Sequence, residues 1–74
     1  MQVEKLDLTG IQRTQAVFKI MLKSTQMKPG DILELSSISS AVRKDLQQIC
    51  EKMRKTPVFL EDDGPDLTRC QIRF

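Results

Sequence analysis

The chain contains two side chains that can act as sulfur nucleophiles, the thiols of Cys50 and Cys70. A thiolate is a strong nucleophile, so these two residues are the first candidates for chemistry. The sequence has no histidine and no C-x-x-C pair, which excludes a Cys-His or Ser-His-Asp arrangement within the chain and a zinc site of the usual Cys/His kind. We therefore expect no metal and no cofactor.

Both cysteines also fit patterns that predict burial. Cys50 shares an apolar helical stripe with four other residues: Val42, Leu46, Ile49 and Met53. Cys70 alternates in phase with Ile72 and Phe74 along an expected strand. Free cysteine is often a small buried hydrophobe, so we expect both thiols in the core and no disulfide between them. The alternative is that one of them is a reactive thiol.

A second candidate site lies at the start of the first expected helix, at Arg13, Thr14 and Gln15. Free backbone N–H groups at a helix start, a capping hydroxyl on Thr14 and an adjacent guanidinium suit an anion such as phosphate, sulfate or a partner's carboxylate. The alternative is a solvated arginine beside an ordinary cap. Four further basic residues extend the predicted anion-binding or partner-binding surface along the two helices: Lys19, Lys23, Arg43 and Lys44.

The charges are segregated along the chain, although the net charge is only +2. Residues 13–28 and 41–55 hold nine basic and two acidic side chains, a sum of +7, and the remainder sums to −5. Helices packed on one sheet face would present a basic surface to an acidic protein or a phosphate backbone. The chain has no Tyr or Trp, and Phe18 is the single aromatic residue of the helices, which weakens a single-stranded RNA interpretation. A solvated face is the alternative.

Hydrophobic periodicity predicts six elements that position these residues. Period-two alternation or short apolar runs predict strands, and 3.6-residue periodicity predicts helices, as follows: strands 3–8, 32–35, 57–61 and 67–74, and helices 14–26 and 41–55. Four residues of the first helix are expected to lie on one face: Val17, Ile20, Met21 and Ser24. Residues 36–40 predict a polar loop in which Ser39 or Ser40 caps the second helix, and residues 62–66 predict a turn. Phe59 is expected on the exposed face of its strand.

The element order β-α-β-α-β-β predicts an α/β fold, specifically an α+β two-layer sandwich. Its four-stranded mixed sheet would carry both helices on one face, and residues 1–74 would form a single domain. The other sheet face is expected to be polar, which favours a monomer. The chain shows neither a membrane-spanning run nor a signal pattern, so we expect a soluble cytoplasmic protein without membrane attachment.

Motifs spread over nearly the whole chain resemble one known family. They are Leu6-Asp7-x-x-Gly10-Ile11, Met27-x-Pro29-Gly30-Asp31, Asp45, Cys50 and Asp63-Gly64. In these residues the chain is similar to the TusA/SirA family of small sulfur-carrier proteins. The resemblance implies the same β-α-β-α-β-β sandwich. It also implies sulfur transfer, because members of the family accept sulfur from a cysteine desulfurase as a persulfide and hand it to partner proteins.

The chain departs from this family at the position that carries the chemistry. The family's C-P-x-P motif places its cysteine at the start of the first helix, where the helix dipole lowers the thiol pKa. The matching positions here are Arg13, Thr14, Gln15 and Ala16, so the cysteine and both prolines are absent. Arginine cannot carry a persulfide, and the family's usual mechanism is therefore not open to this chain.

Three functional hypotheses follow. We favour a non-catalytic interaction or regulatory module, with a protein partner such as a sulfur-relay protein bound at the Arg13 end and the basic helices. The second hypothesis is a persulfide carrier that uses Cys50 or Cys70. The third is a module that binds RNA or another anion through the basic face of the two helices. Intact-mass detection of a persulfide and salt-dependent RNA binding would discriminate among them.

Overall fold

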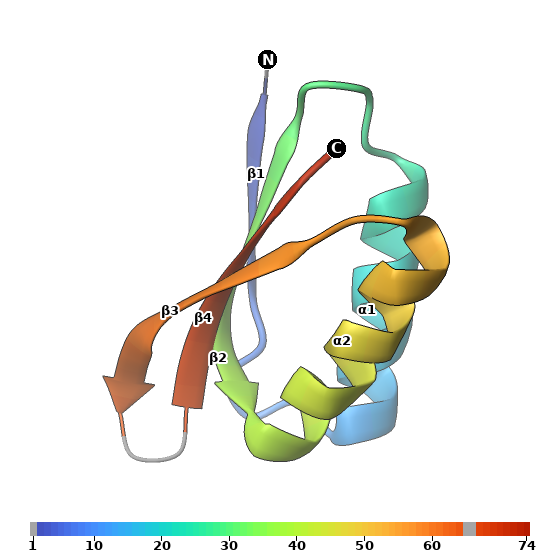
Figure 1. Cartoon of the computed structure of the whole chain (residues 1–74). Coiled ribbons are helices and arrows are strands. Elements are labelled where there is room, and N and C mark those ends of the chain that lie inside the picture. The colour runs from blue at the N-terminus through green and yellow to red at the C-terminus, as the bar shows by residue number, and fades with distance from the viewer. Residues whose placement is uncertain (1, 65–66) are drawn as a thin grey trace.

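The computed structural model places two helices side by side on one face of a four-stranded sheet (Figure 1). It describes residues 2–64 and 67–74, and the side chains of residues 2–60 and 68–74. The elements are β1 (Val3–Asp7), α1 (Arg13–Thr25), β2 (Ile32–Ser39), α2 (Ser40–Met53), β3 (Pro57–Gly64) and β4 (Leu67–Arg73). The strand order is β1-β2-β4-β3, with β1 parallel to β2 and the other neighbours antiparallel. The predicted two-layer sandwich with a mixed sheet is confirmed.

The core lies between the two central strands and the helices. Leu33 and Leu35 of β2 pair with Ile72 and Cys70 of β4, and all four side chains are almost completely buried. Ile20 of α1 packs into the same cluster, together with further buried residues of both helices: Ala16, Val42, Leu46 and Cys50. Neither of the two helices in the described chain is long and apolar enough to cross a membrane.

The loop that leads into α1 is shaped by Asp7 and Gly10. The Asp7 carboxylate accepts hydrogen bonds from the Thr9 backbone N–H at 3.0 Å and the Thr9 hydroxyl at 2.6 Å. These bonds hold the pKa of Asp7 below its ordinary value. Gly10 follows with a φ of +70°, a conformation that costs a residue with a Cβ free energy. The Asp-x-x-Gly spacing seen in the sequence thus directs the chain from β1 into α1.

The turn after α1 is closed by the buried carboxylate of Asp31. It accepts the backbone N–H of Lys28 within the turn and the backbone N–H of Gln2 next to β1, both at 3.0 Å. These two hydrogen bonds lower the pKa of Asp31. Gly30, with a φ of +92°, precedes it. The Gly30-Asp31 pair therefore fixes the far end of α1 against the first two strands.

The predicted polar loop at residues 36–40 is wrong, because β2 continues to Ser39. The register of β2 against β4 shifts between Leu35 and Ile38, and Ser37 has a φ of 59°. This bulge places Leu35 and Ile38, three residues apart, on the same buried face. The Ser39 hydroxyl then accepts the backbone N–H of Val42 at 3.3 Å, so the predicted N-cap of α2 is confirmed.

The predicted orientation of Phe59 is also wrong. Phe59 pairs with Cys70 across β3 and β4, and paired residues share a sheet face, so its ring packs against the core. The Arg43 guanidinium of α2 lies 4.3 Å from the ring centroid and covers it. Val58 and Leu60 point to the open face of the sheet instead. β3 runs to Gly64, beyond its predicted end, and Pro65 and Asp66 of the predicted turn lie outside the described residues.

Candidate functional site

The start of α1 lacks the cap that the sequence predicted. The helix begins at Arg13, and Gln12 occupies the cap position without a side-chain hydrogen bond to the helix. Thr14 is therefore already the second helical residue, and the predicted capping role of its hydroxyl is wrong. One of the three groups proposed for an anion site at this helix start is thus absent.

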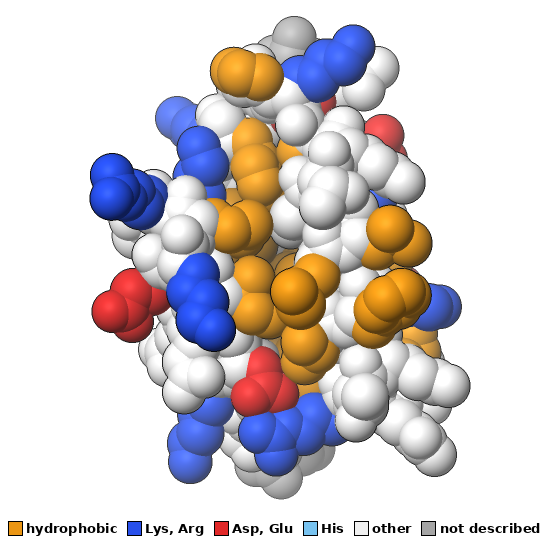
Figure 2. Space-filling model, turned by 90° about the vertical axis from the view of Figure 1, so that its right-hand side faces the viewer, with side chains coloured by type: hydrophobic (Ala, Val, Ile, Leu, Met, Phe, Trp, Pro, Cys, Tyr) orange, Lys and Arg blue, Asp and Glu red, His pale blue; other side chains and the backbone are white. Residues whose placement is uncertain are grey.

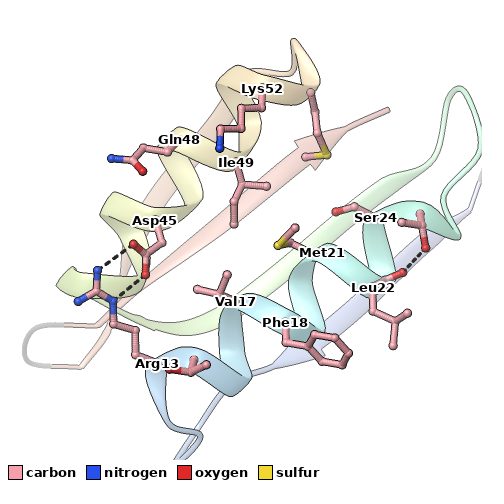
Figure 3. Close-up of a pocket in the computed structure, with 13 residues that line it drawn as sticks. Arg13, Val17, Phe18, Met21, Leu22, Ser24, Asp45, Gln48, Ile49 and Lys52 are labelled. Carbon is pink, nitrogen blue, oxygen red and sulfur yellow. Dashed lines mark hydrogen bonds and ion pairs between the residues drawn. The ribbon is translucent and has the colours of Figure 1, made fainter.

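Arg13 forms a bidentate ion pair with Asp45 of α2. Its Nε donates to Oδ2 at 2.7 Å, and its Nη2 donates to Oδ1 at 2.9 Å. The guanidinium lowers the pKa of the Asp45 carboxyl, chiefly through these hydrogen bonds, and the carboxylate raises the pKa of Arg13. Two parallel N–H···O bonds fix the guanidinium plane in the direction of α2. Arg13 therefore ties the two helices together at their N-terminal ends (Figure 3).

An apolar groove of about 790 Å³ runs between α1 and α2 from this ion pair. Figure 2 shows it as a strip of hydrophobic side chains between the two helices, with basic side chains along one side of the strip and at its ends. Val17 and Met21 of α1 face Ile49 of α2 across it (Figure 3). On the α1 side three lining residues are more than half exposed: Phe18 at 65%, Met21 at 51% and Leu22 at 51%.

The groove exists because α1 carries more apolar side chains than the sheet can cover. Only Ala16, Ile20 and Ser24 of this helix are buried. Val17 is half-buried, and Met21, predicted to share the core face, is exposed and lines the groove. Sequence reasoning missed the groove, although a signal was present. The segment 16–22 is apolar at every position except Lys19, which is too wide for a single buried stripe.

The predicted basic residues do not form one continuous surface. Lys23 makes an ion pair with Glu4 of β1, with 3.3 Å between Nζ and Oε2, and Arg43 lies over Phe59 at the opposite side of the helix layer. Gln15 and Lys19 border a shallow depression that also includes Thr14 and Phe18, next to the main groove. Lys44 is exposed on α2. Lys52, not among the predicted site residues, lines the groove itself.

The two thiols lie in the core, as their periodicity predicts. Cys50 and Cys70 are each 1% exposed, and neither belongs to the groove. Burial raises the pKa of Cys50, and burial together with the nearby Cys50 raises the pKa of Cys70 to about 12. A nucleophilic thiol needs exposure to its reaction partner and a pKa low enough for the thiolate to form. Cys50 and Cys70 meet neither requirement, because both are buried and burial raises the pKa of each.

Comparisons with protein-family models, with curated proteins and with solved structures found no significant match to this chain.

Proposed function

We propose that this protein is a non-catalytic, protein-binding counterpart of the TusA/SirA-like sulfur carriers that it resembles. Its binding site would be the groove between α1 and α2, and its partner would be a protein of a sulfur relay or of a related regulatory complex. The observation that carries the proposal is the apolar groove that begins at Arg13, the position that matches the cysteine of the family's motif.

The ion pair at Arg13 supports a binding role in place of a chemical one. A carrier cysteine at a helix start needs free N–H groups and an open approach for its donor protein. Here the side chain at that position turns toward α2 and engages Asp45 through two hydrogen bonds. This arrangement holds the two walls of the groove in register at one end and leaves the apolar lining exposed beyond it.

The burial of both thiols argues against the alternative of a persulfide carrier that uses Cys50 or Cys70. A donor enzyme would have to reach a sulfur atom that lies beneath the helices and, for Cys70, a thiol whose pKa is raised to about 12. At neutral pH such a thiol is almost entirely protonated and therefore a poor nucleophile.

Two measurements test the proposed function. In the first, the purified protein is incubated with a cysteine desulfurase and cysteine and analysed by intact mass. We expect no reducible adduct of about 32 Da, the mass of one sulfur atom. In the second, a photoreactive phenylalanine analogue replaces Phe18 on the groove in the protein's native host, and a matched variant carries the analogue at Val58 on the open sheet face.

We expect the probe at position 18 to cross-link to a specific protein and the probe at position 58 not to do so. A reducible sulfur adduct would contradict the non-catalytic role. Absence of protein cross-links at position 18, or the same cross-links from both positions, would contradict the assignment of the binding site to the groove.

A further inference from the structure

We infer that the occupant of the α1–α2 groove is an amphipathic α-helix with acidic flanks, supplied by a partner protein. This inference rests on the proposed function and specifies the chemistry of the partner. The groove follows two helices of 13 and 14 residues, which corresponds to a length of about 20 Å at a rise of 1.5 Å per residue. A partner helix of three to four turns would cover it.

The backbone chemistry of the groove favours a helix over an extended strand. Both walls are α-helices, whose main-chain N–H and C=O groups are already bonded within each helix apart from the ends. An extended segment laid between them would leave its own backbone groups unpaired against apolar walls, at a cost in free energy. A helix satisfies its backbone internally and presents only side chains, as in other helix-in-groove complexes.

The lining accepts the apolar face of such a helix. Val17, Met21 and Ile49 converge on the middle of the groove (Figure 3). Met53 of α2 also lines the groove. Methionine side chains are unbranched and adapt to incoming shapes, so Met21 and Met53 can adjust to the partner's apolar residues. Apolar side chains spaced i, i+3 or i+4, and i+7 on the partner would follow the groove.

The charge of the groove selects acidic flanks. Asp45 is the only carboxylate among its described lining residues, and both its oxygens accept from Arg13. Lys52 lines the α2 side, Lys19 borders the adjacent depression on the α1 side, and α1 and α2 together carry six basic and two acidic side chains. A second copy of this chain would bring the lysines at the two grooves together and be repelled, whereas glutamates beside an apolar face would be attracted.

The experiment uses the full chain and synthetic helical peptides. The acidic probe is a fluorescein-labelled peptide of about 18 residues with Leu at i, i+3, i+7 and i+11, Glu at the flanking positions and Ala elsewhere. A basic probe has Lys in place of each Glu, and a third probe has the same composition as the acidic one with its Leu residues scattered around the helix. Binding is measured by fluorescence anisotropy at low and moderate salt.

We expect the acidic probe to bind at least tenfold more tightly than either control and to lose affinity as salt rises. Met21→Glu should weaken its binding at least tenfold. The matched control Val58→Glu introduces the same charge at an equally exposed site, 52% against 51%, on the opposite face of the molecule, and should leave binding within about twofold. Lys52→Glu should weaken binding of the acidic probe and strengthen binding of the basic probe. Far-UV circular dichroism confirms that each variant is folded.

Several outcomes would overturn the inference. Equal affinity for the acidic and basic probes would remove the charge argument, and equal effects of Met21→Glu and Val58→Glu would remove the groove as the site. A dimer that forms in sedimentation equilibrium and is abolished by Met21→Glu would assign the groove to a second copy. Salt-dependent RNA binding that the same variant abolishes would assign it to nucleic acid. If a protein still cross-links at position 18 while the acidic probe fails to bind, the proposed function stands and only the acidic helix is wrong.

Discussion

Both cysteine thiols should react with iodoacetamide at pH 8 about a thousandfold more slowly in the folded protein than in the unfolded chain. The reason is that Cys50 and Cys70 are each 1% exposed, beneath the helix layer, and burial disfavours their thiolate forms. The thiolate is the reacting species, so both its population and its access to reagent control the rate. The prediction matters because a persulfide carrier needs the opposite behaviour.

Two routes to reaction give the same order of magnitude. The pKa of Cys70 rises from 9.0 to about 12, and this difference of about three pH units lowers its thiolate fraction about a thousandfold. Reaction through transient unfolding is limited by stability, which for a core of this size is about 3–5 kcal/mol. At about 1.4 kcal/mol per factor of ten, that stability leaves an open fraction of roughly one in a hundred to one in four thousand.

The assay follows alkylation by intact mass, in native buffer and in concentrated urea as the unfolded reference. The variants Cys50→Ala and Cys70→Ala each leave one thiol, so the two rates are obtained separately. Labelling of either thiol in native buffer within about tenfold of its rate in urea would refute the argument from burial. It would also restore that cysteine as a candidate sulfur carrier.

Three further predictions concern stability. Ser39→Ala should lower the free energy of unfolding by about 1 kcal/mol, because the Ser39 hydroxyl caps α2, whereas Thr14→Ala should change it by less than about 0.5 kcal/mol. Equal losses for the two variants in urea titrations would contradict the observed first residues of the helices. Ile38→Val should lower the free energy of unfolding by about 0.5–1.5 kcal/mol, because Ile38 is fully buried. Calorimetry should show a fall in Tm of several degrees, and an unchanged Tm would mean that Ile38 lies in a surface loop. The folded-state pKa of Cys70 is about 12 and its ordinary value is 9.0, so the unfolded chain loses this proton first. The contribution of Cys70 to the free energy of unfolding is therefore complete below pH 9 and falls as pH rises toward 12, by about 1.4 kcal/mol at pH 10. Urea titrations at pH 8 and pH 10 measure this decline, and an equal decline in Cys70→Ala would show that another group causes it.

Local sequence patterns determined the element order and most of the core. Apolar residues at strand and helix periods were sufficient to predict the two-layer sandwich and the burial of Cys50 and Cys70, because each pattern is complete within one element. The positive φ values at Gly10 and Gly30 also lie where these residues interrupt the periodic segments. The sequence alone also shows that position 13 is an arginine, which cannot carry a persulfide.

The tertiary structure decided which residues meet and which remain uncovered. Arg13 and Asp45 are 32 residues apart, and no local pattern predicts their ion pair, which depends on the helices lying side by side with their N-termini at one end. Val58, Phe59 and Leu60 are all apolar, so strand alternation does not decide which sheet face Phe59 occupies. Its pairing with Cys70 across β3 and β4 places it on the core face. The groove also depends on the tertiary structure. The sequence shows that the apolar residues of α1 extend beyond a single stripe, but packing on the sheet covers only one stripe of each helix. The placement of the two helices therefore leaves Met21 exposed in the groove.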